Sequence, residues 1–264
     1  MANAKDITGE NHAFLMLGDT GSGKTTQLLT LPGKKFVYLF DPNASLSLRG
    51  YDVEYEAFLP ENLNLSAKSL AKGKGDVSPG NNVSDVYRQW EEDFQSRLSD
   101  GFFNDFDVIG MDSATTFLDL IMDRILSING RPGAWPNQDD YGPQMIAFTN
   151  VCRALLGLGK TIYMTGHLEM KQDNLTQRVF RKPMMTGRLS TKIPLLFSDI
   201  FVTECESTPD GMAYRIQTVP DRMTTTVRTS FKGLSPYEDV TLDFSKPLEN
   251  QGLGRIWKDS YGVS

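Results

Sequence analysis

The stretch GDTGSGKT, residues 18–25, combines closely spaced glycines with a lysine and a threonine. Glycines at this spacing let successive backbone N–H groups turn toward one point, where they can bind phosphate oxygens. The Lys24 ammonium would then reach the β- and γ-phosphates, and the Thr25 hydroxyl would coordinate Mg²⁺. The stretch therefore predicts a P-loop that binds a nucleoside triphosphate together with magnesium.

The neighbouring residues provide the elements that a P-loop needs. Residues 13–17 are a short apolar run typical of a buried strand, a helix is expected from Lys24 to Thr30, and residues 36–40 are a second apolar run. This strand–loop–helix–strand order favours the P-loop over its alternative, a glycine-rich turn with an exposed lysine. The residues expected to contact the nucleotide are Gly18, Asp19, Thr20, Gly21, Ser22, Gly23, Lys24, Thr25 and Thr26.

A second magnesium ligand is expected at the end of a neighbouring buried strand. Residues 106–111 form such a strand in the sequence, and Asp112 follows directly. A carboxylate at this place would complete the metal site with Thr25. Two alternatives exist: Asp112 could cap the next helix, or Asp107, which lies inside the strand, could be the ligand.

The rest of the chain alternates between strand and helix patterns. Apolar residues at helical spacing occur at Val86, Tyr87, Trp90, Phe94 and Leu98. Further helices are expected after Asp112 through residue 126 and over 145–156, a strand over 161–165, and a half-exposed strand over 52–58. Later strands at 200–203, 213–219 and 224–229 are expected to be antiparallel, at the edge of the sheet.

Four segments, in this order, carry a resemblance to a known family. DPN follows the second strand, MDSATTF the third, DYGPQM opens a helix and YMTGHLEMK ends the next strand. Together with the P-loop, they resemble the RecA core, in particular the compact phage ATPases grouped as RecA-like single-strand annealing or recombination proteins. The resemblance covers residues 14–244.

The resemblance implies a RecA-like α/β fold for the whole chain. We expect one domain over residues 1–264 with its core at 12–245, built on a mainly parallel sheet flanked by helices, with antiparallel strands toward the C-terminal side. Residues 60–82, poor in large apolar side chains, are expected to form a mobile surface loop, and residues 246–264 a C-terminal tail.

The family's catalytic positions are only partly matched. His167 occupies the place of the polar residue that senses the γ-phosphate, although it could simply cap the end of a strand. Asn43 stands where the family has its water-activating glutamate, and an amide cannot act as a base. Asp41 could take that role, Glu54 or Glu56 could take it, or hydrolysis is slow.

Two segments would face DNA in a RecA-like protein, residues 129–143 and 169–190. The second is net positive in a chain of formal charge −6, and its basic residues are Lys171, Arg178, Arg181, Lys182 and Arg188. Trp135, Tyr141 and Phe180 could stack on unpaired bases. Solvated loop charge is the alternative interpretation.

Three later cations match a family segment that reaches the phosphates of a neighbouring subunit. These are Arg222, Arg228 and Lys232, which would stabilise transferred phosphoryl charge in trans. Such a role would require a homo-oligomer, a ring or a filament. For each residue taken alone, a surface charge that contacts no neighbouring subunit is an equal alternative.

Composition sets broader limits. The hydrophobic content of 39% is ordinary, no apolar run is long enough to span a membrane, and the N-terminus has no signal or transit pattern, so we expect a soluble protein of the cytoplasm, or of the host cytoplasm if a phage encodes it. Cys152 and Cys205 are too far apart for a zinc motif and are expected to be buried thiols.

The function that the sequence favours is ATP hydrolysis with Mg²⁺, coupled to single-stranded DNA in recombination or annealing. Other recombination proteins are possible further partners, and no membrane is expected. Three alternatives stay open: a motor that moves nucleic acid, a nucleotide-dependent DNA binder that does not hydrolyse, and a small-molecule kinase in which residues 178–188 would form an arginine-rich lid.

Overall fold

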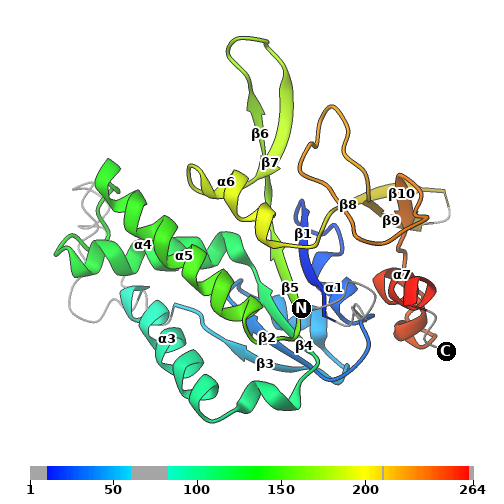
Figure 1. Ribbon diagram of the computed structural model, residues 1–264, viewed down its shortest axis with the longest axis horizontal. Coiled ribbons are helices and arrows are strands. Elements are labelled where there is room, and N and C mark those ends of the chain that lie inside the picture. The colour runs from blue at the N-terminus through cyan, green and yellow to red at the C-terminus, as the bar shows by residue number, and fades with distance from the viewer. Residues whose placement is uncertain (1–10, 61–82, 210, 262–264) are drawn as a thin grey trace, which may run out of the picture.

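The computed structural model describes residues 11–60, 83–209 and 211–261 (Figure 1). The predicted mobile loop, residues 60–82, lies outside these ranges except for Pro60. Within the described part of the chain, no helix is both long and apolar enough to cross a membrane.

An eight-stranded sheet runs through the middle of the molecule in the order β10-β9-β8-β1-β5-β4-β2-β3. Neighbouring strands from β8 to β3 are parallel, whereas β9 and β10 are antiparallel to their neighbours. The prediction of a mainly parallel α/β sheet with antiparallel strands on the C-terminal side is therefore confirmed. The strands are β1 (Ala13–Gly18), β2 (Lys35–Leu39), β3 (Glu54–Ala57), β4 (Val108–Asp112), β5 (Thr161–Gly166), β8 (Asp199–Thr208), β9 (Gly211–Gln217) and β10 (Tyr237–Asp239).

Helices cover both faces of this sheet. The α-helices are α1 (Lys24–Leu28), α3 (Val83–Ser99), α4 (Ala114–Ile128), α5 (Tyr141–Leu156), α6 (Leu189–Lys192) and α7 (Gly252–Tyr261). Short 3-10 helices are η2 (Ala44–Leu48), η3 (Phe102–Asp105), η4 (Gln138–Asp140), η5 (Pro194–Leu196) and η6 (Leu248–Asn250). The helices α3, α4 and α5 pack on one face, and α1 and α7 on the other (Figure 1).

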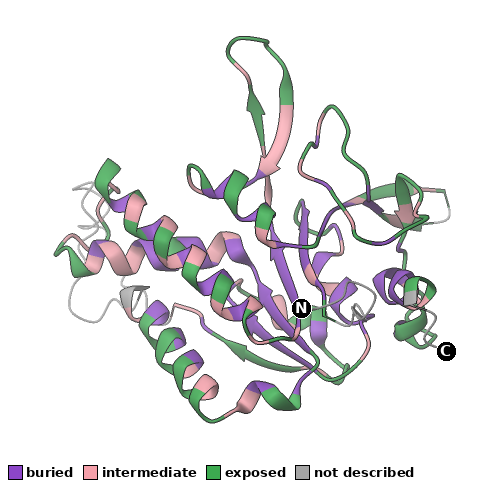
Figure 2. Ribbon diagram, in the orientation of Figure 1, coloured by how far each residue is buried: buried purple, intermediate pink, exposed green. Residues whose placement is uncertain are grey.

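Alternation along β1 explains how one short apolar run serves two cores. Successive side chains of a strand point to opposite faces, and a parallel strand covered by helices on both sides is apolar throughout. Leu15 and Leu17 belong to the core under α3, α4 and α5, while Phe14 and Met16 belong to the core under α1 and α7. Figure 2 accordingly shows the middle of the sheet as buried.

The C-terminal segment differs from the predicted tail. Helix α7 packs against α1, and the side chains of Leu253, Ile256 and Trp257 are buried in the second core. Gln27 of α1 also accepts a hydrogen bond from the backbone N–H of Leu253, at 3.0 Å. These residues are therefore part of the folded body, because α7 closes the face that α1 alone leaves open.

Four other predictions about elements need correction. Residues 169–190 are not a loop, because β6 (Leu168–Gln172) and β7 (Val179–Pro183) pair as an antiparallel hairpin, followed by α6. Residues 224–229 make only isolated bridges and no strand. Strand β8 is antiparallel to β9 but parallel to β1. The predicted DNA segment 129–143 is also shorter than expected, since α5 begins at Tyr141.

Candidate nucleotide-binding site

The loop from Gly18 to Lys24 lies at the carboxyl end of β1, in the middle of the parallel strands. Gly18 must be a glycine, because a Cβ there would lie 2.2 Å from Thr203 Oγ1 on β8. Gly23, with φ 87°, adopts the left-handed conformation that glycine favours and starts α1. The sequence thus turns the chain sharply from strand to helix, as a phosphate-binding loop requires.

Ser22 anchors the loop to the sheet. Its hydroxyl is buried, lies 2.6 Å from Thr203 Oγ1 and donates to the backbone oxygen of Asp19 at 2.7 Å. Thr203 in turn donates to the backbone oxygen of Leu17 at 3.1 Å. Two hydroxyls therefore fix the loop to β1 and β8 before any ligand binds.

Lys24 folds back over the same loop. Its Nζ donates to the backbone oxygens of Gly18 and Asp19 at 3.0 Å and 2.8 Å. Burial lowers the pKa of the Lys24 ammonium, against the opposing attraction of Asp112, Asp19 and Asp41. The negative charge of a phosphate group beside the buried ammonium would favour its charged form.

Asp112 is the last residue of β4 and faces Thr25. Thr25 Oγ1 donates to Asp112 Oδ2 at 2.7 Å, and Thr165, at the end of β5, donates to Oδ1. Burial raises the pKa of the Asp112 carboxyl; the hydrogen bonds from Thr165 and Thr25 oppose this rise. The structure therefore brings together the two residues predicted to hold magnesium.

The alternatives for this carboxylate do not match the structure. The N-cap of α4 is Ser113, whose side chain accepts a hydrogen bond from the Thr116 backbone, so Asp112 does not cap the helix. Asp107 precedes β4 and accepts a hydrogen bond from the Lys34 backbone N–H at 2.8 Å. It therefore lies at the opposite end of the strand from the P-loop.

Asp41 is the candidate base that the structure places nearest to the P-loop. It follows β2, accepts a hydrogen bond from Thr116 at the start of α4, and acts electrostatically on both Lys24 and Asp112. Asn43 is exposed, with its backbone in the left-handed region at φ 65°. Its position supplies no carboxylate.

The other two candidate bases lie elsewhere. Glu54 pairs with Lys34 at 2.7 Å, and Glu56 pairs with Arg97 at 2.9 Å. Both glutamates are on β3, an exposed edge strand beyond β2. Neither glutamate has a contact with the P-loop among the described hydrogen bonds and ion pairs, so the structure favours Asp41 over both.

His167 follows β5 directly and connects the site to the projecting hairpin. Its backbone N–H donates to Thr115 Oγ1 on α4 at 3.0 Å, and its backbone oxygen accepts from Met184 at 2.8 Å. Thr165, which contacts Asp112, is only two residues earlier. The role of the imidazole ring in sensing phosphate stays a prediction. His167 itself lies between the site and the hairpin, because it separates β5 from β6.

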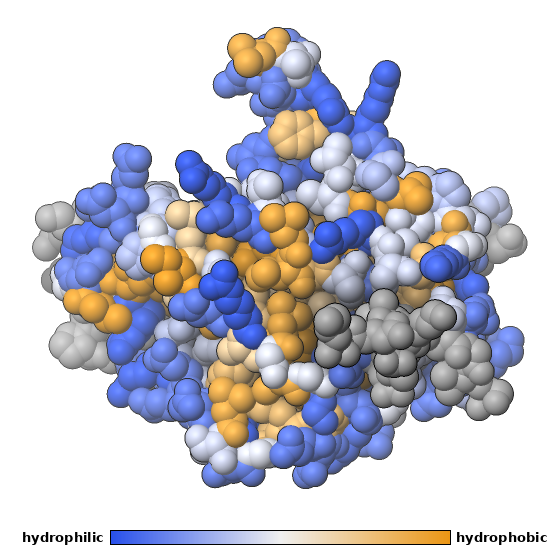
Figure 3. Space-filling view, in the orientation of Figure 1, coloured by the Kyte–Doolittle hydropathy of each residue, from blue (hydrophilic) through white to orange (hydrophobic). Residues whose placement is uncertain are grey.

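The hairpin of β6 and β7 projects beyond the sheet (Figure 1), and its surface is largely hydrophilic in Figure 3. Most of its predicted DNA-binding cations are bonded within the chain. Lys171 and Lys182 pair with Glu169 at 3.0 Å and 3.3 Å, and Arg181 pairs with Glu204 at 3.0 Å. These ion pairs reduce the charge that the hairpin offers to phosphates.

Arg178 and Arg188 differ in what they contact. The Arg178 guanidinium donates to the backbone oxygen of Arg222. Arg188 is exposed after the hairpin, and within the described residues it has no ion-pair partner. Of the five predicted cations, Arg188 is therefore the one most available to a nucleic acid.

The aromatic residues proposed for stacking are unequally available. Trp135 is 84% exposed and Tyr141 37% exposed, whereas Phe180 is half-buried in β7. Tyr141 lines a groove with Lys171 and Arg188 between α4, α5 and the hairpin. Part of the first predicted DNA segment therefore does lie beside the second.

The three predicted trans-acting cations do not form one group. The Arg228 guanidinium donates to the backbone oxygens of Pro194, Leu195 and Phe197, so it stabilises the η5 turn of its own chain. Arg222 and Lys232 have exposed side chains. Only these two remain candidates for a contact in trans.

Two hydroxyl residues of the site were missed by the sequence reasoning. Thr165 orients Asp112, and Thr116 orients Asp41. Both stand at the carboxyl-end edge of the sheet, Thr165 at the end of β5 and Thr116 in the first turn of α4. A polar residue at the end of an apolar strand, as in YMTG, was the available signal for Thr165.

The donor set fits magnesium. A hydroxyl and a carboxylate are hard oxygen donors, and Mg²⁺ in nucleotide sites usually takes one or two protein ligands with phosphates and waters. Among the described residues no group of three or more histidine, cysteine or acidic side chains could hold a metal alone. Cys152 is buried, with its thiol pKa raised by burial to about 12, but Cys205 is exposed, contrary to expectation.

Comparison with known proteins identifies the class that this loop and sheet define. Residues 10–230 match the family model described as AAA domain. The match covers most of the chain, so the protein belongs to the AAA domain family of P-loop proteins. A search of curated proteins found no match.

Two solved structures show a weaker likeness. The flagellar accessory protein FlaH from Methanocaldococcus jannaschii is 14% identical, with a TM-score of 0.39, over 88% of this chain and 85% of the other. The KaiC-like protein PH0186 from Pyrococcus horikoshii OT3 is 16% identical, with a TM-score of 0.37, over 88% and 86%.

Proposed function

We propose that the protein is a magnesium-dependent ATPase of the RecA-like type that acts on single-stranded DNA in recombination or strand annealing. The observation that carries the proposal is the 2.7 Å hydrogen bond between Thr25 Oγ1 and Asp112 Oδ2. It joins the P-loop to the end of β4, where the second magnesium ligand is expected. Membership of the AAA domain family supports the nucleotide part of the proposal.

Each residue of the site has a distinct task in this proposal. Bound magnesium would supply positive charge beside the phosphates, and Thr25 and Asp112 are the residues that would hold it. Lys24 would exchange its two backbone acceptors for phosphate oxygens. Asp41 would accept the proton of the attacking water, with Thr116 fixing its carboxylate.

The DNA part of the proposal depends on the hairpin of β6 and β7. The hairpin begins two residues after the end of β5, so the strand that carries Thr165 leads directly into it. Arg188, Lys171 and Tyr141 line the neighbouring groove, which combines cations with an aromatic ring. A homo-oligomer, ring or filament, is part of the same proposal, with Arg222 and Lys232 as the trans cations.

The kinase alternative receives little support from the arrangement. An arginine-rich lid would need free guanidinium groups, but Arg178 is bonded to the Arg222 backbone and Arg181 to Glu204. The motor alternative uses the same site and differs only in what nucleotide turnover drives. The experiment below therefore includes a test for movement on duplex DNA.

The test is phosphate release from ATP and Mg²⁺ by the full chain, with and without single-stranded DNA. The proposal expects turnover that DNA stimulates and no strand separation on a forked duplex. Stimulated turnover with strand separation would favour the motor instead. No effect of DNA on turnover or on ATP affinity would remove the recombination proposal, while leaving the ATPase assignment to be judged by turnover alone.

A further inference from the structure

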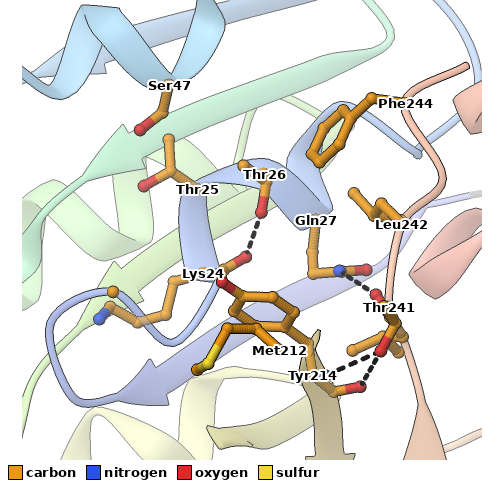
Figure 4. Close-up of a pocket in the computed structure, with 13 residues that line it drawn as sticks. Lys24, Thr25, Thr26, Gln27, Ser47, Met212, Tyr214, Thr241, Leu242 and Phe244 are labelled. Carbon is orange, nitrogen blue, oxygen red and sulfur yellow. Dashed lines mark hydrogen bonds between the residues drawn. The ribbon is translucent and has the colours of Figure 1, made fainter. Parts of the chain in front are cut away.

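A pocket of about 450 Å³ opens beside the P-loop, along α1 (Figure 4). This volume lies within the range of roughly 300–1,000 Å³ common for small-molecule sites. Thr25, Thr26 and Gln27 of α1 form its floor. The pocket is therefore continuous with the proposed phosphate site, since Gly21, Gly23 and Lys24 of the P-loop also line it.

Apolar side chains from two distant segments form the walls. Met212 and Tyr214 come from β9, and Leu242 and Phe244 come from the segment that precedes α7. Figure 4 shows these two pairs approaching α1 from different sides of Gln27. The walls thus converge on α1 from segments on different sides of the pocket.

The two aromatic rings are placed differently. The Tyr214 ring lies against the P-loop, since a Cβ on Gly23 would be 3.1 Å from Tyr214 Cδ1. Phe244 is 60% exposed and approaches Tyr51, with ring centroids 6.4 Å apart. An exposed aromatic ring at the mouth of a pocket has a free face on which a flat ligand can stack.

Three polar side chains of the pocket, those of Gln27, Thr241 and Thr26, are already bonded to the protein, whereas Ser47, which also lines the pocket, is exposed. Gln27 donates to the Val240 backbone oxygen at 2.9 Å and accepts from the backbone N–H of Leu253. The Thr241 hydroxyl accepts from the Tyr214 backbone N–H at 2.8 Å, and the Thr26 hydroxyl donates to the Gly23 oxygen at 2.8 Å. Few side-chain groups are left to read the edge of a base.

The site determines which way a bound nucleotide would be oriented. The γ-phosphate belongs near Asp112 and Asp41, so the sugar and base must leave the P-loop on the other side, past Thr26. We propose that this pocket binds the purine base of the nucleotide between Tyr214 and Phe244 by stacking and apolar contact, and discriminates weakly between adenine and guanine. The inference rests on the proposed nucleotide binding.

The test compares the affinities of ATP, GTP and inorganic tripolyphosphate, each with Mg²⁺, by calorimetry. Because stacking on an aromatic side chain contributes substantially to base binding, Phe244→Ala and Tyr214→Ala should each weaken ATP and GTP about tenfold and leave tripolyphosphate unchanged. Tyr214→Phe should keep wild-type affinity. The control is Tyr55→Ala, an aromatic residue 49% exposed on the edge strand β3.

The outcomes separate this inference from the proposed function. If the native chain bound neither ATP nor tripolyphosphate, the proposed function itself would fail. If it bound ATP no better than tripolyphosphate, or if folded Phe244→Ala kept full ATP affinity, the base pocket would be wrong while the P-loop assignment stood. An ATP preference over GTP of more than about tenfold would overturn the weak discrimination, because such preference needs polar groups that read the base.

Discussion

Thr25 and Asp112 are 87 residues apart in the chain, yet the threonine hydroxyl donates to the aspartate carboxylate at 2.7 Å. The parallel register explains this contact: β1 and β4 both pair with β5, so their carboxyl ends meet at one edge of the sheet. A residue after one strand and a residue at the end of another can then share one metal ion. Asp41, which follows β2, lies at the same edge, because β2 runs parallel to β4.

Asp112→Asn should lower ATP turnover and weaken the affinity for Mg²⁺ by about 10- to 100-fold, the range seen when groups around a metal are altered. The Mg²⁺ concentration needed for half-maximal phosphate release should rise accordingly. The amide keeps the shape of the side chain, so the fold should survive. Asp107→Asn is the matched control at the other end of β4 and should leave the Mg²⁺ titration of phosphate release unchanged. Equal Mg²⁺ curves for the native chain and Asp112→Asn would contradict the metal site.

Asp41→Asn should lower the turnover number by about 10²- to 10⁴-fold, the usual contribution of a general base, with little change in ATP affinity. Single-turnover hydrolysis and equilibrium binding, measured separately, check the two parts. Glu56→Gln is the control, because Glu56 pairs with Arg97 on the edge strand. Loss of turnover in the control but not in Asp41→Asn would reverse the assignment.

The sequence identified the P-loop and the parallel strands of the central sheet because their signals are local. Continuous apolar runs such as residues 13–17 are typical of strands buried on both faces, and the P-loop follows one directly. Thr165 was missed because its significance depends on Asp112, 53 residues earlier in the chain. Pairing across such distances is set by the fold as a whole.

The hairpin and α7 were missed for different reasons. The strands β6 and β7 are largely polar and mostly outside the core, so they lack the apolar alternation by which strands are recognised. Helix α7 begins with two glycines in three residues, which weakens its helical signal. Its buried face, with Ile256 and Trp257, packs on the core that includes Leu28 of α1, a contact between distant parts of the chain that local sequence patterns do not predict.

Arg188→Ala should weaken binding of single-stranded DNA and reduce the slope of log affinity against log salt by about 0.7, the value for loss of one phosphate contact. The measurement is fluorescence anisotropy of a labelled oligonucleotide across a salt series. Arg88→Ala, an exposed arginine on α3, is the charge-matched control. An identical slope for Arg188→Ala and the native chain would exclude Arg188 from the DNA contact.

Asp123 on α4 offers a test of electrostatics in stability. Burial, followed by repulsion from Asp119, raises the pKa of its carboxyl to about 6. Because the folded-state pKa lies above that of the unfolded chain, the ionised group destabilises the fold above pH 6, and this cost disappears as the pH falls toward 4. Asp123→Asn should therefore stabilise the protein at pH 7.

The expected gain is on the order of 1 kcal/mol, reduced from the full shift because the side chain is only partly buried and solvent screens its charge. That corresponds to about 2–4 °C in Tm for a chain of this size. Thermal unfolding should show the full gain at pH 7 and a clearly smaller gain at pH 4.5, which lies between the unfolded and the folded pKa. Asp52→Asn, an exposed residue before β3, is the control, and a gain of equal size at both pH values would contradict the account.

The most direct test of the P-loop is Lys24→Ala in a combined binding and phosphate-release experiment with ATP and Mg²⁺. Lys24 is buried, and its ammonium donates to the backbone oxygens of Gly18 and Asp19 in its own loop, so truncating the side chain should leave the fold intact. We predict loss of turnover and a large loss of ATP affinity. A folded Lys24→Ala protein that bound and hydrolysed ATP like the native chain would contradict the assignment of residues 18–25 as the nucleotide site.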